Sequence, residues 1–268
     1  MKKIFILGNG FDLNLGLKTG YSHFMHSEMF NNLTLSGNQL ADHLRNRFMG
    51  NIPNWVDIEL ELDSYTHRSL DEAQFKKEYS SLRVELINYL NSIDYKKYIK
   101  DSSAYNLLKD NIKPGDDFTI FDFNYTPTTK SILLELGISV KAFNLVKIHG
   151  DLDNKNIIFG IHDDAGDSEL KVKIKKSFQE NFEGARIIDI MNQSDHLFIF
   201  GHSLGKTDEM YFGPPFRLYT RGSKERDLSL YYYDDNGLDK LNTRINNLIG
   251  GNGFGFRKHT KVKRIKTK

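Results

Sequence analysis

The sequence predicts an α/β fold that is Rossmann-like, with a largely parallel sheet and a long helical insertion after the first strand. Short apolar segments bounded by Gly, Asp or Asn recur along the chain, and helix-like stretches separate several of them. Strands that alternate with helices are typical of parallel sheets, because a helix carries the chain back to the start of the next strand. The first apolar segment, residues 4–7, also runs directly into Gly8-Asn9-Gly10, and a glycine turn after a first strand is typical of nucleotide-binding sheets.

Six segments have the length and composition of strands, since each is short, largely apolar and bounded by turn-forming residues. They are residues 4–7, 118–123, 145–149, 157–161, 196–200 and 228–233. Helices are expected over residues 126–136, 172–191 and 239–249. The first and last of these repeat apolar residues at helical spacing, whereas the middle one has mixed charge and apolar residues only late in the stretch.

The interval from Tyr21 to Asn111 shows only helical patterning. Apolar residues recur there at spacings of three and four, as at Tyr79, Leu82, Leu86, Leu90 and Ile93. We therefore expect a helical insertion at about residues 21–115 that covers the glycine turn. It would belong to a single Rossmann-like α/β domain of residues 1–256, followed by a basic C-terminal tail of residues 257–268.

Composition excludes several kinds of site. The 268 residues contain no cysteine, which excludes disulfides, thiolate zinc sites and a cysteine nucleophile. No stretch approaches the ~20 apolar residues of a membrane-spanning helix, and the N-terminus lacks the features of a signal peptide. We therefore expect a cytoplasmic protein without membrane contact. His23 and His26 are near one another in sequence but have no clear acidic partner, so we predict no metal site.

The tail contains seven Lys/Arg residues and no acid, in a chain whose net charge is only +2. This composition favours a disordered, solubilising terminus. The alternative is a weak contact with nucleic acid through the basic tail.

Polar residues follow two of the expected strands. Asn124 follows the second expected strand, and ligands bind at the carboxyl ends of parallel strands. Its side-chain amide can donate a hydrogen bond to a ribose or an amide and accept one from it. Thr126 precedes Pro127, which favours a helix N-cap. His149 ends the third strand, where it could act as a general base near neutral pH or bond a neighbouring loop.

The last motif, Gly201-His202-Ser203-Leu204-Gly205, again follows an expected strand. A Gly/Ser loop in that place can contact a phosphate or a ribose. The same order matches the G-x-S-x-G turn of hydrolases, which would make Ser203 a nucleophile. Only His259 follows it, inside the tail, so the required order of an acid and then a histidine fails.

Taken in order, these motifs resemble the bacteriophage abortive-infection AbiH proteins. The resemblance begins with Gly8-Asn9-Gly10-Phe11-Asp12-Leu13 and covers residues 4 to about 249. It continues through Trp55-x-Asp57-Ile58-Glu59, Phe123-Asn124-Tyr125-Thr126, His149-Gly150, Phe159-Gly160-Ile161 and the motif from Gly201 to Asp208. The resemblance implies a cytoplasmic, bacterial antiphage role.

A more distant likeness, to sirtuins and sirtuin-like NAD hydrolases, implies a chemistry. By this likeness the glycines of the first turn would approach the pyrophosphate of NAD. Asn124 would bind near the nicotinamide ribose or position a water, and His149 would act as the base on a ribose hydroxyl and help to expel nicotinamide. Gly201 and Ser203 would hold the adenosine side. The predicted cofactor-binding residues are Gly8, Asn9, Gly10, Asp12, Thr126, Gly201 and Ser203.

The chain departs from the sirtuin pattern in three places. Its opening reads Gly-Asn-Gly-Phe-Asp instead of Gly-Ala-Gly-x-Ser, the zinc cysteines are absent, and Thr126 stands where an Asp is usual. The missing cysteines argue against protein deacetylation.

The leading hypothesis is an antiphage protein that binds NAD as a substrate and cleaves it to nicotinamide and ADP-ribose. A phage-derived trigger or partner protein and an oligomeric state belong to the same hypothesis. The alternatives are a nuclease or nucleic-acid-binding effector, and a nucleotide-sensing module without turnover.

Overall fold

The computed structural model describes residues 1–50, 58–67, 71–139, 141, 144–161, 165–166, 168–179, 185–221 and 224–267. The chain divides into two compact units. The first comprises residues 1–17, 95–155 and 182–268, and the second comprises residues 18–94 and 156–181.

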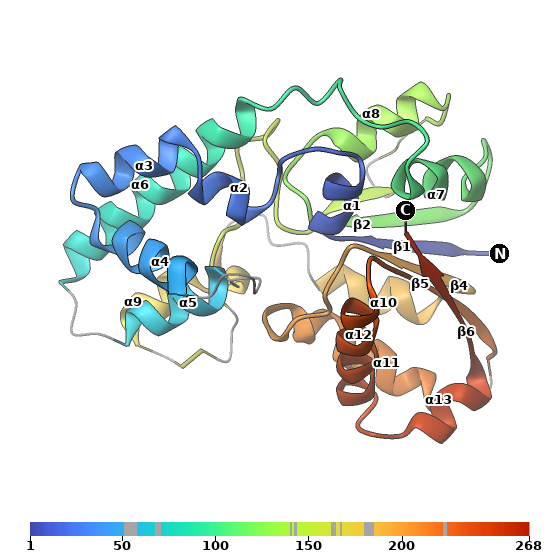
Figure 1. Cartoon of the computed structure of the whole chain (residues 1–268). Coiled ribbons are helices and arrows are strands. Elements are labelled where there is room, and N and C mark those ends of the chain that lie inside the picture. Colours follow the sequence, from blue (N-terminus) through green and yellow to red (C-terminus); the bar gives the residue numbers. More distant parts are fainter. Residues whose placement is uncertain are drawn as a thin grey trace. The chain divides into compact units, whose positions relative to one another are not determined.

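The first unit contains a six-stranded parallel sheet (Figure 1). Its strands are β1 (Lys3–Leu7), β2 (Phe118–Asp122), β3 (Leu145–Lys147), β4 (His196–Phe200), β5 (Arg226–Tyr232) and β6 (Thr260–Lys266). They lie in the order β3-β2-β1-β4-β5-β6, and each neighbouring pair is parallel. This is the strand order of the dinucleotide-binding Rossmann sheet, which confirms the predicted fold class.

Helices cover both faces of this sheet (Figure 1). The elements are α1 (Asn9–Asn14), α7 (Ser103–Asn111), α8 (Thr128–Glu135), α10 (Ala185–Asn192), η2 (Lys206–Asp208), α11 (Glu209–Tyr219), α12 (Asp235–Leu248) and α13 (Gly253–His259). Successive residues of a strand face opposite sides. Ile4 and Ile6 of β1 therefore join the buried cluster that includes α10, α11 and α12. Phe5 faces the other side and stacks on Phe198 of β4, with 4.6 Å between ring centroids.

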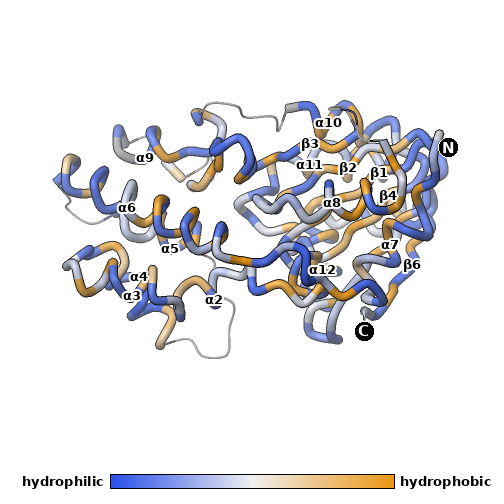
Figure 2. The backbone as a smooth tube through the Cα atoms, turned by 90° about the horizontal axis from the view of Figure 1, so that it is seen from above, coloured by the Kyte–Doolittle hydropathy of each residue, from blue (hydrophilic) through white to orange (hydrophobic). Residues whose placement is uncertain are grey.

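The second unit is helical. It contains α2 (Tyr21–Met25), α3 (Glu28–Leu35), α4 (Gln39–Gly50), α5 (Ile58–Thr66), α6 (Glu72–Asn91), α9 (Glu169–Ile174) and η1 (Lys176–Phe178). Helix α6 begins where the Asp71 side chain accepts a hydrogen bond from Gln74 N, and it buries Leu82, Leu86 and Leu90 at helical spacing. Figure 2 shows α6 alternating between hydrophilic and hydrophobic residues. No helix in the described part of the chain is long and apolar enough to cross a membrane.

Residues 157–161 are not a strand of the sheet, contrary to the sequence prediction. Ile161 forms only an isolated bridge with Lys175, and the segment belongs to the second unit. Its apolar side chains are buried there, and the Phe159 ring stacks on Tyr79 of α6. The short apolar run therefore marks burial rather than a sheet strand. The single helix expected over 172–191 is likewise replaced, in the described residues, by the end of α9, η1 and α10.

The C-terminal tail is ordered over residues 260–266, so the expectation of a disordered terminus is wrong there. These residues form β6, which pairs along its whole length with β5. Val262 packs against the core cluster, while Lys261, Lys263 and Arg264 are exposed. An edge strand tolerates cationic side chains, which also discourage pairing with another chain.

Candidate site at the carboxyl edge of the sheet

The carboxyl ends of the central strands lie side by side at one edge of the sheet. β1 ends at Leu7, whose register partners are Asp122 at the end of β2 and Phe200 at the end of β4. The chain passes from β1 to β2 on one side and later returns to β4 on the other. This edge therefore contains the switch point at which open α/β sheets bind ligands. All the predicted site residues follow β1, β2, β3 or β4, in the first unit.

The glycines after β1 and β4 allow two loops to meet backbone to backbone. Gly8 N donates to Phe200 O, and Gly10 N donates to Gly201 O, each at 3.0 Å. A Cβ on Gly8 would lie 2.6 Å from Gly201 O, and a Cβ on Gly201 would lie 2.3 Å from Phe11 N. Gly201 also has a φ of +64°, in the left-handed region. From the sequence, these glycines were expected to let a ligand approach the backbone. In the structure they are also needed for the close contact between the loops after β1 and β4.

Asp12 is completely buried beside the loop that follows β2. Its Oδ2 accepts a hydrogen bond from Thr126 Oγ1 at 2.7 Å, and Thr128 Oγ1 donates to Thr126 Oγ1 at 3.1 Å. Its Oδ1 has no hydrogen-bond partner among the described residues. Burial raises the pKa of the Asp12 carboxyl to about 7, against a smaller lowering by the Thr126 hydrogen bond. Asp12 therefore changes charge near neutral pH.

Asn124 joins the ends of β1 and β2. Its Nδ2 donates to Gly8 O at 3.2 Å and to Asp122 Oδ1 at 3.0 Å, which leaves Oδ1 as its remaining hydrogen-bonding atom. The buried Asp122 carboxylate is paired with Lys147 Nζ at 2.7 Å. Lys147 Nζ also donates to the carbonyl oxygens of Asn124 and Thr126. This lysine therefore fastens the loop after β2 to β3.

Sequence reasoning assigned no role to Lys147. Its partner becomes visible only from the sheet register, in which Asp122 lies opposite Lys147. A lone lysine near the end of a short strand carries no such signal.

Two buried histidines share one buried carboxylate at this edge. His149 Nε2 lies 3.4 Å from Asp208 Oδ1, and His202 Nε2 lies 3.3 Å from Asp208 Oδ2. The Nδ1 atom of His202 accepts a hydrogen bond from Leu204 N at 2.9 Å. His149 was a predicted catalytic residue, whereas the sequence analysis gave His202 and Asp208 no catalytic or binding role. The signal for both was the Gly-His-Ser-Leu-Gly-Lys-Thr-Asp run, but only the folded loop shows that the two side chains meet.

Phe123 covers this pair of histidines. Its ring makes edge contacts with His149 and His202, with 5.1 and 4.3 Å between ring centroids. Tyr211 of α11 packs against the same phenylalanine. The histidines therefore lie in surroundings of low polarity, where electrostatic contacts are stronger than in water.

The loop after β4 lacks the geometry of a hydrolase nucleophile turn. That turn would hold Ser203 in a strained conformation, but the left-handed residues of this loop are Gly201 and Leu204, with φ of +64° and +50°. Ser203 is exposed, and Leu204 is buried. The structure therefore does not favour Ser203 as a nucleophile, and its predicted contact with the adenosine side stays a prediction.

Two motifs of the resemblance, Phe159-Gly160-Ile161 and the one that ends at Glu59, lie in the second unit. Glu59 of α5 pairs with the fully buried Lys176 of η1 at 2.7 Å. This contact is internal to that unit. Trp55 and Asp57, from the same motif, lie outside the described residues.

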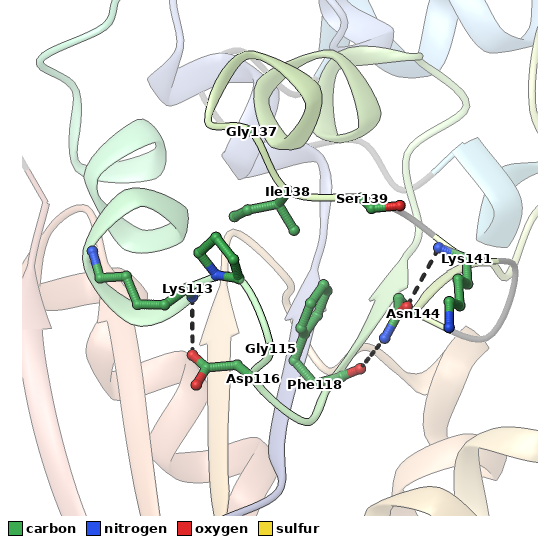
Figure 3. Close-up of a pocket in the computed structure, with 10 residues that line it drawn as sticks. Lys113, Gly115, Asp116, Phe118, Gly137, Ile138, Ser139, Lys141 and Asn144 are labelled. Carbon is green, nitrogen blue, oxygen red and sulfur yellow. Dashed lines mark hydrogen bonds between the residues drawn. The ribbon is translucent and has the colours of Figure 1, made fainter.

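A cavity of about 330 Å³ lies at the opposite, amino edge of the sheet (Figure 3). Lys113, Phe118, Ile138 and Asn144 are among the residues that line it. None of the predicted site residues lines this cavity. Among the described residues, no group of three or more His, Asp and Glu side chains is placed to hold a metal ion.

Comparisons with known proteins give a family and one partial relative. The model of a family described as "Bacteriophage abortive infection AbiH" matches residues 4–221. A DNA primase of Thermotoga maritima is 28% identical over 144 residues, which cover 51% of this chain and 22% of the primase. The chain thus corresponds to about a fifth of the length of that primase. No solved structure matches the chain significantly.

Proposed function

The chain belongs to the bacteriophage abortive infection AbiH family, and from this premise we propose that it binds NAD at the carboxyl edge of its sheet and cleaves it to nicotinamide and ADP-ribose. Loss of NAD would halt the infected cell and so stop the phage. The proposal joins the antiphage role of the family to the chemistry that the site residues can perform.

One observation carries the proposal. The strand order β3-β2-β1-β4-β5-β6 places two glycine loops at the switch point of a parallel sheet, where dinucleotides bind in folds of this order. The N–H groups of Gly8 and Gly10 already bond to the protein. Additional donors would therefore come from the rest of these loops. A carboxyl at Asp12 with a pKa of about 7 carries less charge at neutral pH than an ordinary aspartate, which lowers its repulsion of an anionic ligand.

The proposed reaction breaks one bond of the ribose and forms another. The bond between C1′ of the ribose and N1 of nicotinamide breaks, and the bonding pair leaves with nicotinamide, which becomes neutral. Water then bonds to C1′, and its proton is released. His149, paired with Asp208, would take the proton of a ribose hydroxyl as the positive charge develops on the sugar and return it once water has bonded to C1′. Asn124 Oδ1 would orient the ribose or the water.

The test is release of nicotinamide, followed by chromatography after the purified protein is incubated with NAD. We expect release by the wild-type protein and a loss of roughly 100-fold or more in His149→Ala, the usual range for a general base. His259→Ala is the matched control, because His259 lies at the end of α13, just before the start of β6 at the amino edge of the sheet, and should retain full turnover. Full turnover in His149→Ala would exclude His149 as the base.

A nucleotide-sensing module gives a different result in the same samples. NAD would then raise the melting temperature by binding the folded state, while no nicotinamide forms. A repeat of the assay with a lysate of phage-infected cells tests the proposed phage-derived trigger.

A nucleic-acid-binding effector is the second candidate, favoured by the partial similarity to a DNA primase and by the cations of β6. Two of those cations are already paired, Lys261 with Glu225 and Lys266 with Asp235. Deleting the tail would remove a strand, so the test is the double variant Lys263→Gln/Arg264→Gln. This candidate requires salt-dependent binding of DNA or RNA that weakens in the variant.

A further inference from the structure

Asp208 lies between two histidines, and each of its carboxylate oxygens faces a different imidazole. The separations are 3.4 Å to His149 Nε2 and 3.3 Å to His202 Nε2. All three side chains are buried in the first unit. Contacts of this length often shorten when a ligand excludes water from a site. The arrangement therefore bears on which nitrogen of each ring carries the proton.

The proton position on His202 follows from the backbone. Its Nδ1 accepts the N–H of Leu204 at 2.9 Å, so this nitrogen carries a lone pair. A neutral imidazole has one protonated nitrogen, which must then be Nε2. The protonated Nε2 of His202 therefore faces Asp208 Oδ2 at 3.3 Å. One carboxylate oxygen thus faces an imidazole that cannot change its tautomer without losing the Leu204 hydrogen bond.

The loop that directs this N–H has an unusual backbone. Leu204 has a φ of +50°, a left-handed conformation that is unfavourable for a residue other than glycine. Leu204 is only 1% exposed, so burial of its side chain in the core offsets that cost. The sequence Gly-His-Ser-Leu-Gly thus folds into a support for His202.

We infer that Asp208 and His202 are positioning residues that hold His149 in the tautomer with its proton on Nε2 and its lone pair on Nδ1. The carboxylate is an acceptor only, so the nitrogen of His149 that faces it must be the protonated one. The Phe123 ring, in contact with both histidines, keeps the group in surroundings of low polarity and strengthens the effect. The catalytic consequence rests on the proposed function: Nδ1 is the nitrogen that takes the proton during cleavage of NAD.

The proton position can be measured without any substrate. The full chain is labelled with 15N-histidine, and long-range proton–nitrogen spectra are recorded at about pH 8, above the usual pKa of imidazole. His149→Gln and His202→Gln assign the two rings. We expect both rings to be protonated at Nε2. A wild-type His149 that carries its proton on Nδ1 would overturn the inference.

Asp208→Asn gives a sharper result, because an amide has one accepting and one donating end. The accepting oxygen should stay with His202, whose tautomer the Leu204 N–H holds. The donating NH2 group then faces His149 and requires a lone pair on Nε2. We expect the tautomer of His149 to switch to Nδ1–H while that of His202 does not change. An unchanged His149 in a folded variant contradicts the inference, and if the variant does not fold, the wild-type spectrum decides. Asp153→Asn, an exposed site, is the matched control.

Turnover separates this inference from the proposed function. A wrong tautomer at a base lowers kcat, by roughly 100-fold or more, with little change in KM. If the wild-type protein releases no nicotinamide but shows the expected tautomers, the proposed function fails and the positioning role stands. If nicotinamide is released while His149 keeps its proton on Nδ1, the positioning role fails alone.

Discussion

At the scale of single residues, Asp12 links burial to pH. Its pKa is raised from 3.8 to about 7, so the folded state holds a proton that the unfolded state has already lost between these values. Stability should therefore fall as the pH rises through this window, by about 1 kcal/mol per pH unit. Asp12→Asn cannot titrate and should remove this part of the slope. The measurement is the free energy of unfolding in urea at about pH 5 and about pH 8.

The comparison uses the difference between the two proteins, since other titrating groups contribute equally to both. Relative to the wild-type protein, the free energy of unfolding of Asp12→Asn should be higher at about pH 8 than at about pH 5, because the variant has no buried carboxyl to ionise. Asp153→Asn, at the surface, should follow the wild-type curve. Parallel curves for Asp12→Asn and the wild-type protein would show that Asp12 is not titrating in this range.

Alanine substitutions at two glycines with similar φ angles distinguish the cost of a steric clash from the cost of backbone strain. Gly201 and Gly137 have φ of +64° and +72°, but a Cβ would lie 2.3 Å from Phe11 N in the first case and in open space in the second. Gly137→Ala should cost about 1 kcal/mol of stability, through φ alone. Gly201→Ala should cost roughly 3 kcal/mol or more, because the two loops must also move apart. Equal losses in thermal unfolding would mean that the loops do not pack as described.

At the scale of elements, β6 is structural rather than a loose tail. Ending the chain after His259 would expose the edge of β5, where Leu228 and Leu230 are buried, and remove Val262 from the core. We expect a large loss of stability and a tendency to aggregate. The Lys263→Gln/Arg264→Gln pair should change stability by no more than about 0.5 kcal/mol each. Light scattering and thermal unfolding check both. A truncated chain as stable as the full one would show that β6 adds nothing to the sheet.

Three of the strands that sequence analysis identified, β1, β2 and β4, are buried along almost their whole length. Residues 4–7 and 196–200 read as apolar runs because they are buried on both faces of a parallel sheet. β6 was missed because an edge strand needs only one apolar side, and the cations between Val262 and Ile265 resemble a charged tail. Residues 157–161 were wrongly predicted to be a strand, because an apolar run can also be buried without pairing with a neighbouring strand.

Sequence analysis could likewise find the single residues of the candidate site but not the contacts between them. Local motifs identified His149 and Asn124, because each follows a strand at the carboxyl edge. The pairing of Asp208 with two histidines needs the fold of the loop after β4 and the position of β3 beside β2, and neither leaves a local pattern. Lys147 likewise needed the sheet register.

At the scale of the whole molecule, the two units divide the family's motifs between them. The histidines, Asp12 and Asn124 lie in the first unit, whereas Glu59 and Lys176 form a buried ion pair in the second. Lys176→Met would remove this cation from a carboxylate that is 7% exposed, which typically costs about 3–5 kcal/mol. Glu59→Gln added to it should recover much of that loss, because no buried charge then remains without this partner.

Hydrogen exchange shows which elements are destabilised by Lys176→Met. The second unit has its own buried helices, so we expect Lys176→Met to raise exchange in α5 and α6 while the amides of β1, β2 and β4 keep their protection. Equal loss of protection in both units would instead mean that they unfold as one cooperative body. In the expected case, an assay of the variant for the proposed release of nicotinamide tells whether the first unit alone is enough for this activity. A fall in kcat with the sheet still protected would assign the helical unit a part in the reaction that its ion pair maintains.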